Sequence, residues 1–265
     1  MTGNNHGLYP RFGRVGLVSK GIVYCITGVM AFIGAFELGG GGGEVNKSGI
    51  FSFVEQAGGR TALGILALGL LCYCIWRGIQ AFSDKEHKGN SAKGLGTRAV
   101  YLLSGIAYLL LAIYAGKMAL FHQKGSGGDS QQNLASQLLD KPFGPALLGL
   151  VALIIAGVGI YQAYYGLSGH YKKHVEGLSA HDSTSRLLLV SGRIGYLAKG
   201  IVWLLIATLL AKAALHTNAG EAGDTGKAFA FLEQWSFGSY LLGAVAFGLV
   251  CYGVFNFIRA RYERF

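Results

Sequence analysis

Charged residues are scarce in this sequence. Only 14% of its 265 residues are Asp, Glu, Lys or Arg, whereas 52% are hydrophobic and the mean hydropathy is +0.41. Soluble domains carry about 25% charged residues, so this composition excludes an ordinary soluble domain. Six apolar runs reach the roughly 20 residues that a helix needs to cross a bilayer, which predicts a polytopic membrane protein. The runs cover residues 14–37, 60–82, 98–121, 143–168, 193–215 and 238–259.

Carboxylates are almost absent from the apolar runs. The sequence has 13 acidic residues, and Glu37, at the end of the first run, is the one that lies within any of them. Proton-driven transport and intramembrane hydrolysis usually depend on acidic groups inside the membrane, so their absence argues against both mechanisms. Because no other catalytic constellation is present, we expect a protein that is not an enzyme and that needs no cofactor.

Cysteine and proline are also rare. The four cysteines, Cys25, Cys72, Cys74 and Cys251, lie inside apolar runs, where cysteine acts as a small hydrophobic residue, so no disulfide framework is predicted. The three prolines all lie outside the first, third and fifth runs. This excludes the proline-containing signature of mitochondrial carriers, which share only the general plan of three two-span repeats.

The net charge of +10 follows the predicted topology. If the six spans cross the membrane in alternating directions, the side that holds the N-terminus carries sixteen of the 23 Lys and Arg residues. Cytoplasmic loops carry the Lys and Arg excess, so both termini are expected in the cytoplasm. We therefore expect membrane lipids as partners, with anionic headgroups at the cytoplasmic face, and other proteins or further copies of the chain. No nucleic acid is expected.

Three copies of a two-span unit make up the chain. When Arg14, Arg98 and Arg193 are aligned, each is followed seven residues later by glycine and ten residues later by an aromatic residue. Each copy has two spans, so all three have the same orientation. This predicts an all-α membrane protein of three parallel two-helix repeats, arranged as a pseudo-threefold bundle. The predicted repeats are 11–83, 95–168 and 190–262, within a single membrane domain that covers 1–265.

A glycine-rich loop and a short amphipathic stretch separate the two spans of each copy. The amphipathic stretches are IFSFVEQ, NLASQLLD and AFAFLEQW. Their composition predicts short helices that lie at the outer membrane interface.

Two copies open with the motif Arg-x-Gly-x-x-x-Lys-Gly-Ile, at residues 14–22 and 193–201, and the second copy contains the turn Lys-Pro-Phe-Gly at 141–144. Over nearly the whole chain, the sequence resembles domain-of-unknown-function family twelve-zero-six (DUF1206). The resemblance implies a six-span protein of the bacterial cytoplasmic (inner) membrane and implies no particular activity. The second copy departs from the opening motif, with Val100 in place of glycine and Ser104 in place of lysine.

The candidate ligand-binding residues are basic or polar and lie in the half expected to face the cytoplasm. Lys20 and Lys199 follow the opening arginines by six residues, about 9 Å along a helix. A ring of such side chains suits an anion, a phosphate or an anionic lipid headgroup. Alternatively, long cations near helix ends reach the interface and bind nothing specific. The candidates are Arg14, Lys20, Arg77, Arg98, Gln162, Arg193, Lys199 and Asn256.

Three smaller patterns have structural interpretations. The repeated glycines Gly21, Gly105 and Gly200 predict close helix contacts. Aromatic residues recur on the second span of each copy and indicate either core packing or the lining of a cavity. His122, His216 and Glu37 hold near-equivalent positions at outer span ends, which is more typical of the water interface than of a metal or pH-sensing site. No metal site is therefore predicted.

Two functional hypotheses remain. The first is a helical bundle whose cytoplasmic half has a cavity or pathway that binds a small anionic or amphiphilic molecule or a lipid headgroup. The second is a non-transporting membrane scaffold or an accessory subunit of a larger complex. A lipid-modifying enzyme is a weaker third hypothesis, since catalytic residues are missing. A cavity that reaches Lys20, Arg77 and Lys199 would support the first hypothesis, whereas outward-facing side chains would contradict it.

Overall fold

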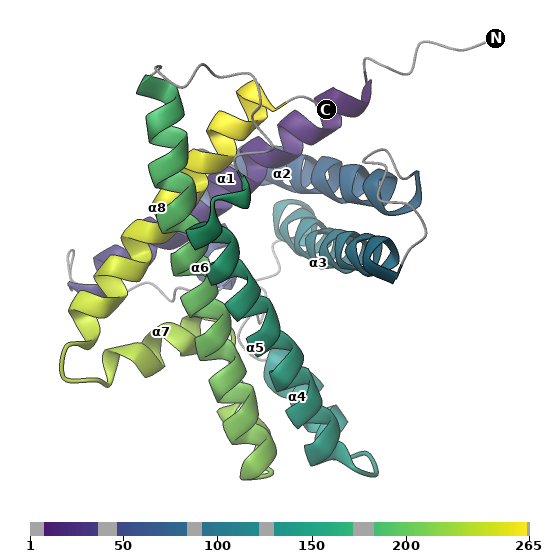
Figure 1. Cartoon of the computed structure of the whole chain (residues 1–265), viewed down its shortest axis with the longest axis vertical. Helices are drawn as coiled ribbons and strands as arrows, with labels where there is room; N and C mark the ends of the chain where they lie inside the picture. The colour runs from purple at the N-terminus through teal and green to yellow at the C-terminus, as the bar shows by residue number, and fades with distance from the viewer. Residues whose placement is uncertain (1–7, 37–46, 84–91, 122–129, 172–182, 264–265) are drawn as a thin grey trace.

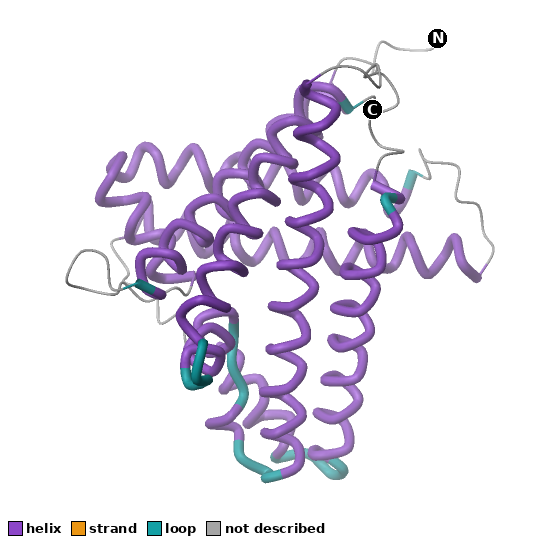
Figure 2. The backbone as a smooth tube through the Cα atoms, turned by 60° about the vertical axis from the view of Figure 1, so that its left-hand side comes forward, coloured by secondary structure: helices purple, strands orange, loops and turns teal. Residues whose placement is uncertain are grey.

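The chain folds as a bundle of helices. The computed structural model describes residues 8–36, 47–83, 92–121, 130–171 and 183–263. Within these ranges there are eight α-helices, the short 3-10 helix η2 and no strand (Figure 2). The elements are α1 (Leu8–Ala35), α2 (Lys47–Phe82), α3 (Ala92–Phe121), α4 (Ser130–Leu139), α5 (Gly144–Ser168), α6 (Ser183–Leu215), η2 (Ala219–Glu221), α7 (Thr225–Glu233) and α8 (Gly238–Tyr262).

Six helices are long and apolar enough to cross a membrane, which confirms the six predicted spans. They are α1, α2, α3, α5, α6 and α8. Three of them begin well before their apolar runs, since α1 starts at Leu8, α3 at Ala92 and α6 at Ser183. The runs mark residues that match the hydrocarbon region, whereas helical hydrogen bonding continues into the polar flanks.

Each repeat has a short helix before its second span, as the amphipathic stretches predicted. In the first repeat it is the start of α2, which bends at Gly59, where φ is 67°. In the other repeats α4 and α7 lead into α5 and α8 through Phe143 and Phe237. A Cβ at Gly144 or Gly238 would lie 2.5 Å from carbonyl oxygens at the end of the short helix. Only glycine allows the second span to start so close to that helix.

The closest helix pairs join neighbouring repeats. Helix α2 packs along α3, α5 along α6, and α8 along α1. The second span of each repeat therefore lies beside the first span of the next, and the third repeat closes onto the first. Figure 1 shows these pairs, with α2 and α3 extending to the right and α5 and α6 extending downwards. This cyclic order is what a pseudo-threefold arrangement requires.

The repeated glycines lie at these junctions between repeats. A Cβ at Gly21 would meet the ring of Phe257 on α8 at 2.6 Å, and a Cβ at Gly200 would meet the carbonyl oxygen of Gly159 on α5 at 2.9 Å. Gly105 faces α2 less tightly, with its nearest atom at 3.4 Å. The predicted close helix contacts are thus confirmed, because small residues let membrane helices approach at these points.

The two spans of the second repeat lie apart, whereas the two spans of each other repeat pack together. We call the second repeat open and the other two closed. Helix α1 packs on α2 and α6 on α8, whereas no contact of comparable extent joins α3 and α5 among the described residues. In the closed repeats, a Cβ at Gly16 or Gly195 would lie 2.6 Å from the Cα atom of Tyr73 or Tyr252. The second repeat has Val100 at this position, 61% exposed. A valine side chain occupies the space that the approaching helix needs, so the sequence accounts for the opening.

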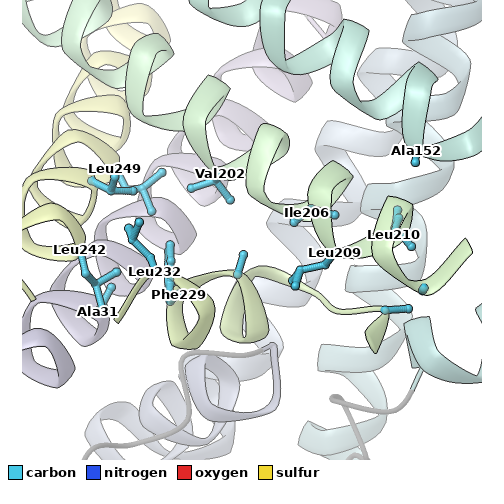
Figure 3. Packing of buried hydrophobic residues seen from close by; sticks show 14 of the residues in the cluster. Ala31, Ala152, Val202, Ile206, Leu209, Leu210, Phe229, Leu232, Leu242 and Leu249 are labelled. Atoms are coloured by element: carbon cyan, nitrogen blue, oxygen red, sulfur yellow. The ribbon is translucent and has the colours of Figure 1, made fainter. Parts of the chain in front are cut away.

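The largest buried apolar cluster lies at the end of the bundle that contains α7. In Figure 3, Phe229 and Leu232 of α7 lie in this cluster next to Leu249 and Leu242 of α8 and Ala31 of α1. A separate cluster, which includes Phe51 and other residues of α2 and α3, holds that pair together. The opposite end holds Arg14 and the end of α8, and we call it the basic end. It contains two smaller clusters, rich in aromatic residues, around Tyr73 and Tyr252, and the polar site described next.

Candidate functional site

The side chain of Lys20 lies inside the bundle, although it belongs to an apolar span. It is 4% exposed, and its Nζ donates a hydrogen bond of 3.2 Å to the hydroxyl of Tyr73. The same Nζ lies 5.1, 5.7 and 5.3 Å from the ring centroids of Tyr73, Tyr108 and Tyr252. These rings come from α2, α3 and α8, so one helix of each repeat contributes a ring around this cation. Lys20 does not extend to the interface, so the interfacial alternative is wrong for this residue.

Lys199 reaches the same group of tyrosines from α6. Its Nζ donates a hydrogen bond of 3.4 Å to the hydroxyl of Tyr252 and lies 4.9 Å from that ring and 5.6 Å from the ring of Tyr24. The rings of Tyr24 and Tyr252 meet edge to face at 4.7 Å. We call the two lysines and these tyrosines the lysine–tyrosine cluster; its members are Lys20, Lys199, Tyr24, Tyr73, Tyr108 and Tyr252.

The first and third repeats make the same lysine–tyrosine contact. Lys20 with Tyr73 and Lys199 with Tyr252 are both separated by 53 residues. In the second repeat, Ser104 replaces the lysine and Val158 replaces the tyrosine. Both partners are therefore missing together in the open repeat. The cluster has two copies of one contact and not three, as the departure at Ser104 indicated for the lysines.

Arg77 extends the cluster through the hydroxyl of Tyr73. Its Nε and Nη2 donate to that oxygen at 3.0 and 2.8 Å, and its Nη1 donates to Oε1 of Gln80 at 2.9 Å. The Tyr73 hydroxyl oxygen thus accepts hydrogen bonds from both Lys20 and Arg77. The guanidinium carbon also lies 4.9 Å from the ring centroid of Tyr101.

Lys20, Lys199 and Arg77 therefore lie close together without a carboxylate partner among the described residues. No carboxylate of the described residues forms a salt bridge with Lys20, Lys199 or Arg77; the ion pairs in these ranges join His216 with Glu221 and Arg259 with Glu263. Removing a charge from water without a partner is costly, and cation–π contacts offset only about 0.5–2 kcal/mol each. The cluster and Arg77 thus bring three basic side chains together within the spanning helices.

The arginines that open the spans do not join this centre. Arg98 caps the end of α2, because its Nε and Nη2 donate to the carbonyl oxygens of Ala81 and Phe82 at 2.6 and 3.1 Å. Arg14 and Arg193 are exposed. Arg14 lines a groove between α1 and α8 at the basic end. Equivalent positions in the three repeats therefore have different surroundings, and the eight candidates do not form one ring.

Gln162 and Asn256 hold the repeat position that Arg77 occupies in the first repeat. Their amide oxygens are buried and have no hydrogen-bond partner among the described residues. The Nδ2 of Asn256 donates to the carbonyl oxygen of Tyr252 at 2.6 Å, one turn earlier on α8. The structure thus places Asn256 beside the lysine–tyrosine cluster and leaves one acceptor unused.

Sequence reasoning missed one buried ion pair near this region. Arg259 and Glu263 contact each other at 2.7 and 2.8 Å, and both are buried at the end of α8. Their spacing of four residues is a visible signal, but Glu263 lies beyond the apolar run that defined the span. At the other end of the bundle, His216 Nδ1 lies 2.9 Å from the carboxylate oxygens of Glu221.

The histidine and acidic residues give no metal site in the part of the chain that the structure describes. No group of three or more His, Cys, Asp or Glu side chains in these residues has the arrangement of metal ligands. His122 and Glu37, which the repeat alignment grouped with His216, lie outside the described residues.

Comparison with known proteins agrees with the repeats seen in the structure. The family described as Domain of Unknown Function (DUF1206) matches residues 15–84, 99–169 and 194–263. The chain is 28% identical over 253 residues to the "Uncharacterized protein YxxB" of Bacillus subtilis (strain 168), covering 96% of this chain and 90% of that protein. No solved structure matches the chain. Neither the family description nor the relative's name assigns a catalytic activity. The three tandem matches, each on one helix pair, show that the chain belongs to the DUF1206 family.

Proposed function

We propose that this chain is an anion-binding membrane protein and that the lysine–tyrosine cluster holds the anion. The observation that carries the proposal is the meeting of Lys20, Lys199 and Arg77 within spanning helices, without a carboxylate partner among the described residues. An anion between them supplies the missing counter-charge in a medium of low dielectric, where the attraction is strong. The tyrosine hydroxyls offer hydrogen-bond donors to the same ligand.

The residues have separate roles in the proposed site. Lys20 and Lys199 supply the charge that contacts the anion, each from a span of a closed repeat. Arg77 donates two hydrogen bonds to Tyr73 and one to Gln80, so it acts as a positioning residue for the Tyr73 ring. The rings of the cluster lie 4.5 to 4.7 Å apart in pairs and occupy the space between the cations. This close packing favours a small anion whose entry displaces tyrosine side chains.

Binding of labelled anions to the full chain in liposomes tests this proposal. The panel contains a halide, a small carboxylate and inorganic phosphate, and the variant is the double substitution Lys20→Met and Lys199→Met. Loss of two charge-assisted contacts is expected to weaken binding of the preferred anion at least about tenfold. Lys117→Met, at an exposed position of α3, is the matched control and is expected to bind as the original chain does.

Normal insertion of the double variant with unchanged binding of every anion would contradict the proposal. Accumulation of the anion inside sealed liposomes, measured in the same samples, separates transport from binding alone. Uptake that requires both lysines assigns the cluster to a pathway, whereas saturable binding without uptake assigns it to a sensor or an accessory site.

We also propose that the protein lies in the bacterial inner membrane with its basic end on the cytoplasmic side. Anionic lipid headgroups are the proposed partners at that face. This orientation is supported by the excess of Lys and Arg on the side of both termini. A green fluorescent protein fused after Phe265 is expected to fluoresce, and alkaline phosphatase at the same place to be inactive, because the first folds in the cytoplasm and the second outside it. Active phosphatase with a dark fluorescent fusion would reverse the orientation.

A second candidate function is a membrane scaffold or an accessory subunit. The separation of α3 and α5 favours it, since both helices expose most of their apolar residues. Val100, Leu103 and Leu153 are 61, 67 and 71% exposed. The apparent mass of the chain extracted with native lipids distinguishes the two functions: a stable larger complex supports the scaffold, whereas a single chain that retains anion binding supports the anion site.

A further inference from the structure

A groove lies between the start of α1 and the end of α8, at the basic end. Its volume is about 550 Å³, within the range of 300–1,000 Å³ that is usual for small-molecule sites. It does not contain the lysine–tyrosine cluster, so it is a separate site from the one proposed above. The lining residues are Arg14, Val18, Phe257, Ala260, Arg261 and Tyr262.

The charge of the groove is positive and unbalanced. Arg14 and Arg261 are exposed, and neither forms a salt bridge with a carboxylate among the described residues. Glu263, the acid nearest in sequence, uses both carboxylate oxygens to bind Arg259. Two guanidinium groups on facing helices present the planar, bidentate donors that suit a phosphate.

The remainder of the groove is apolar. Val18 lies one turn after Arg14 on α1, and Phe257 lies about one turn before Arg261 on α8, so both are deeper in the span than the arginines. Phe257 packs against the backbone of Gly21, where a Cβ would meet its ring at 2.6 Å. This contact holds the aromatic floor in place.

An apolar stripe continues from the groove along α1. Val15, Val18 and Ile22 follow the spacing of one helix face and are 46, 39 and 36% exposed. Arg14 and Tyr262 are at the ends of their spans, the level at which headgroups and interfacial aromatic residues lie. The groove thus has cations at headgroup level and an apolar surface that leads towards the hydrocarbon region.

We infer that this groove binds one anionic glycerophospholipid, with the phosphate between Arg14 and Arg261 and an acyl chain along Val18, Ile22 and Phe257. A free phosphate ion satisfies only the arginines and leaves the apolar floor in water. A zwitterionic headgroup brings its own cation next to two guanidinium groups. The charge and the apolar continuation therefore select a lipid of net negative charge, and the site joins the first repeat to the third.

Native mass spectrometry of the full chain, purified in detergent, tests the inference. Phosphatidylglycerol and phosphatidylcholine with identical acyl chains are titrated separately, and inorganic phosphate is added as a competitor. Phosphatidylglycerol is expected to bind at least about tenfold more tightly than phosphatidylcholine, and the double variant Arg14→Gln, Arg261→Gln to lose this preference. Arg193→Gln is the matched control, because Arg193 is the exposed repeat equivalent of Arg14 and does not line the groove.

A second variant can still decide the question if the double variant does not fold. Val18→Trp fills the apolar part of the groove from an exposed position and is expected to reduce phosphatidylglycerol binding while the arginines remain. Equal binding of both lipids, retention of the preference in both variants, or displacement of the lipid by millimolar inorganic phosphate would overturn the inference. Lys20→Met is expected to leave lipid binding unchanged, so the outcome does not depend on the central anion site.

Discussion

Replacing Gly195 with valine is expected to lower the melting temperature of the bundle by roughly 2–12 °C. A Cβ at this position lies 2.6 Å from the Cα atom of Tyr252 and 2.7 Å from its Cβ. Overpacking of this kind costs about 1–3 kcal/mol, and each kcal/mol corresponds to about 2–4 °C for a chain of this size. Thermal unfolding of the purified full chain, followed by circular dichroism, measures the effect. We also expect Lys199 and Tyr252 to separate, because they belong to the same helix pair.

Gly157→Val in α5 is the matched control for this prediction. A Cβ at Gly157 meets no atom within 4 Å, so valine there is expected to leave the melting temperature nearly unchanged. Gly16→Val is expected to behave like Gly195→Val, because its Cβ meets the Cα atom of Tyr73 at the same distance of 2.6 Å. Equal melting temperatures for Gly195→Val and Gly157→Val would show that the approach of α6 to α8 does not depend on glycine.

Lys20→Met is expected to raise the melting temperature in the absence of added anion, by roughly 2–8 °C. Lys20 is 4% exposed, and its partners among the described residues are tyrosines, so its buried charge is poorly compensated. Exchanging a buried ionic group for an apolar group of similar size is often stabilising, and about 1–2 kcal/mol is expected here. The preferred anion is expected to stabilise the original chain in proportion to its binding and to have no such effect on the variant.

This prediction separates a binding role from a purely structural one. If Lys20 served to hold the rings of Tyr73, Tyr108 and Tyr252 together, methionine would lower the melting temperature with or without anion. Lys117→Met, on the exposed face of α3, controls for the loss of one positive charge from the chain. A lower melting temperature for Lys20→Met but not for Lys117→Met would contradict the anion site.

Much of the fold was predictable because it depends on one-dimensional patterns. Hydropathy and length identified all six spans, and amphipathic composition identified the short helices before the second spans. Self-comparison predicted the three repeats and the glycines at their junctions. The helix starts were less accurate, since α6 begins at Ser183, ten residues before its apolar run. Hydropathy describes the fit to a bilayer, whereas a helix ends where its backbone hydrogen bonds end.

The sequence also contained the residues that mark the open second repeat, but it did not show their structural consequence. Val100 and Ser104 were visible as departures from the repeat, and they indicated only that a threefold site was incomplete. The structure shows that the first of them coincides with the separation of α3 and α5. A side chain at this position opposes a close approach, because the helix contacts at Gly16 and Gly195 leave no room for a Cβ.

By itself the sequence determined the class of protein, the number of spans, the repeats and the glycines at the junctions between repeats. These follow from composition and spacing, which do not depend on how helices face one another. Only the tertiary structure decided the direction of each cation: Lys20 turns inward to tyrosines, Arg98 caps α2, and Arg14 lines a groove. A soluble helix reveals its inner face by polarity, but in a membrane protein the lipid is as apolar as the core. The two faces of α1 therefore have similar polarity in the sequence, and only packing against α2 and α8 distinguishes them.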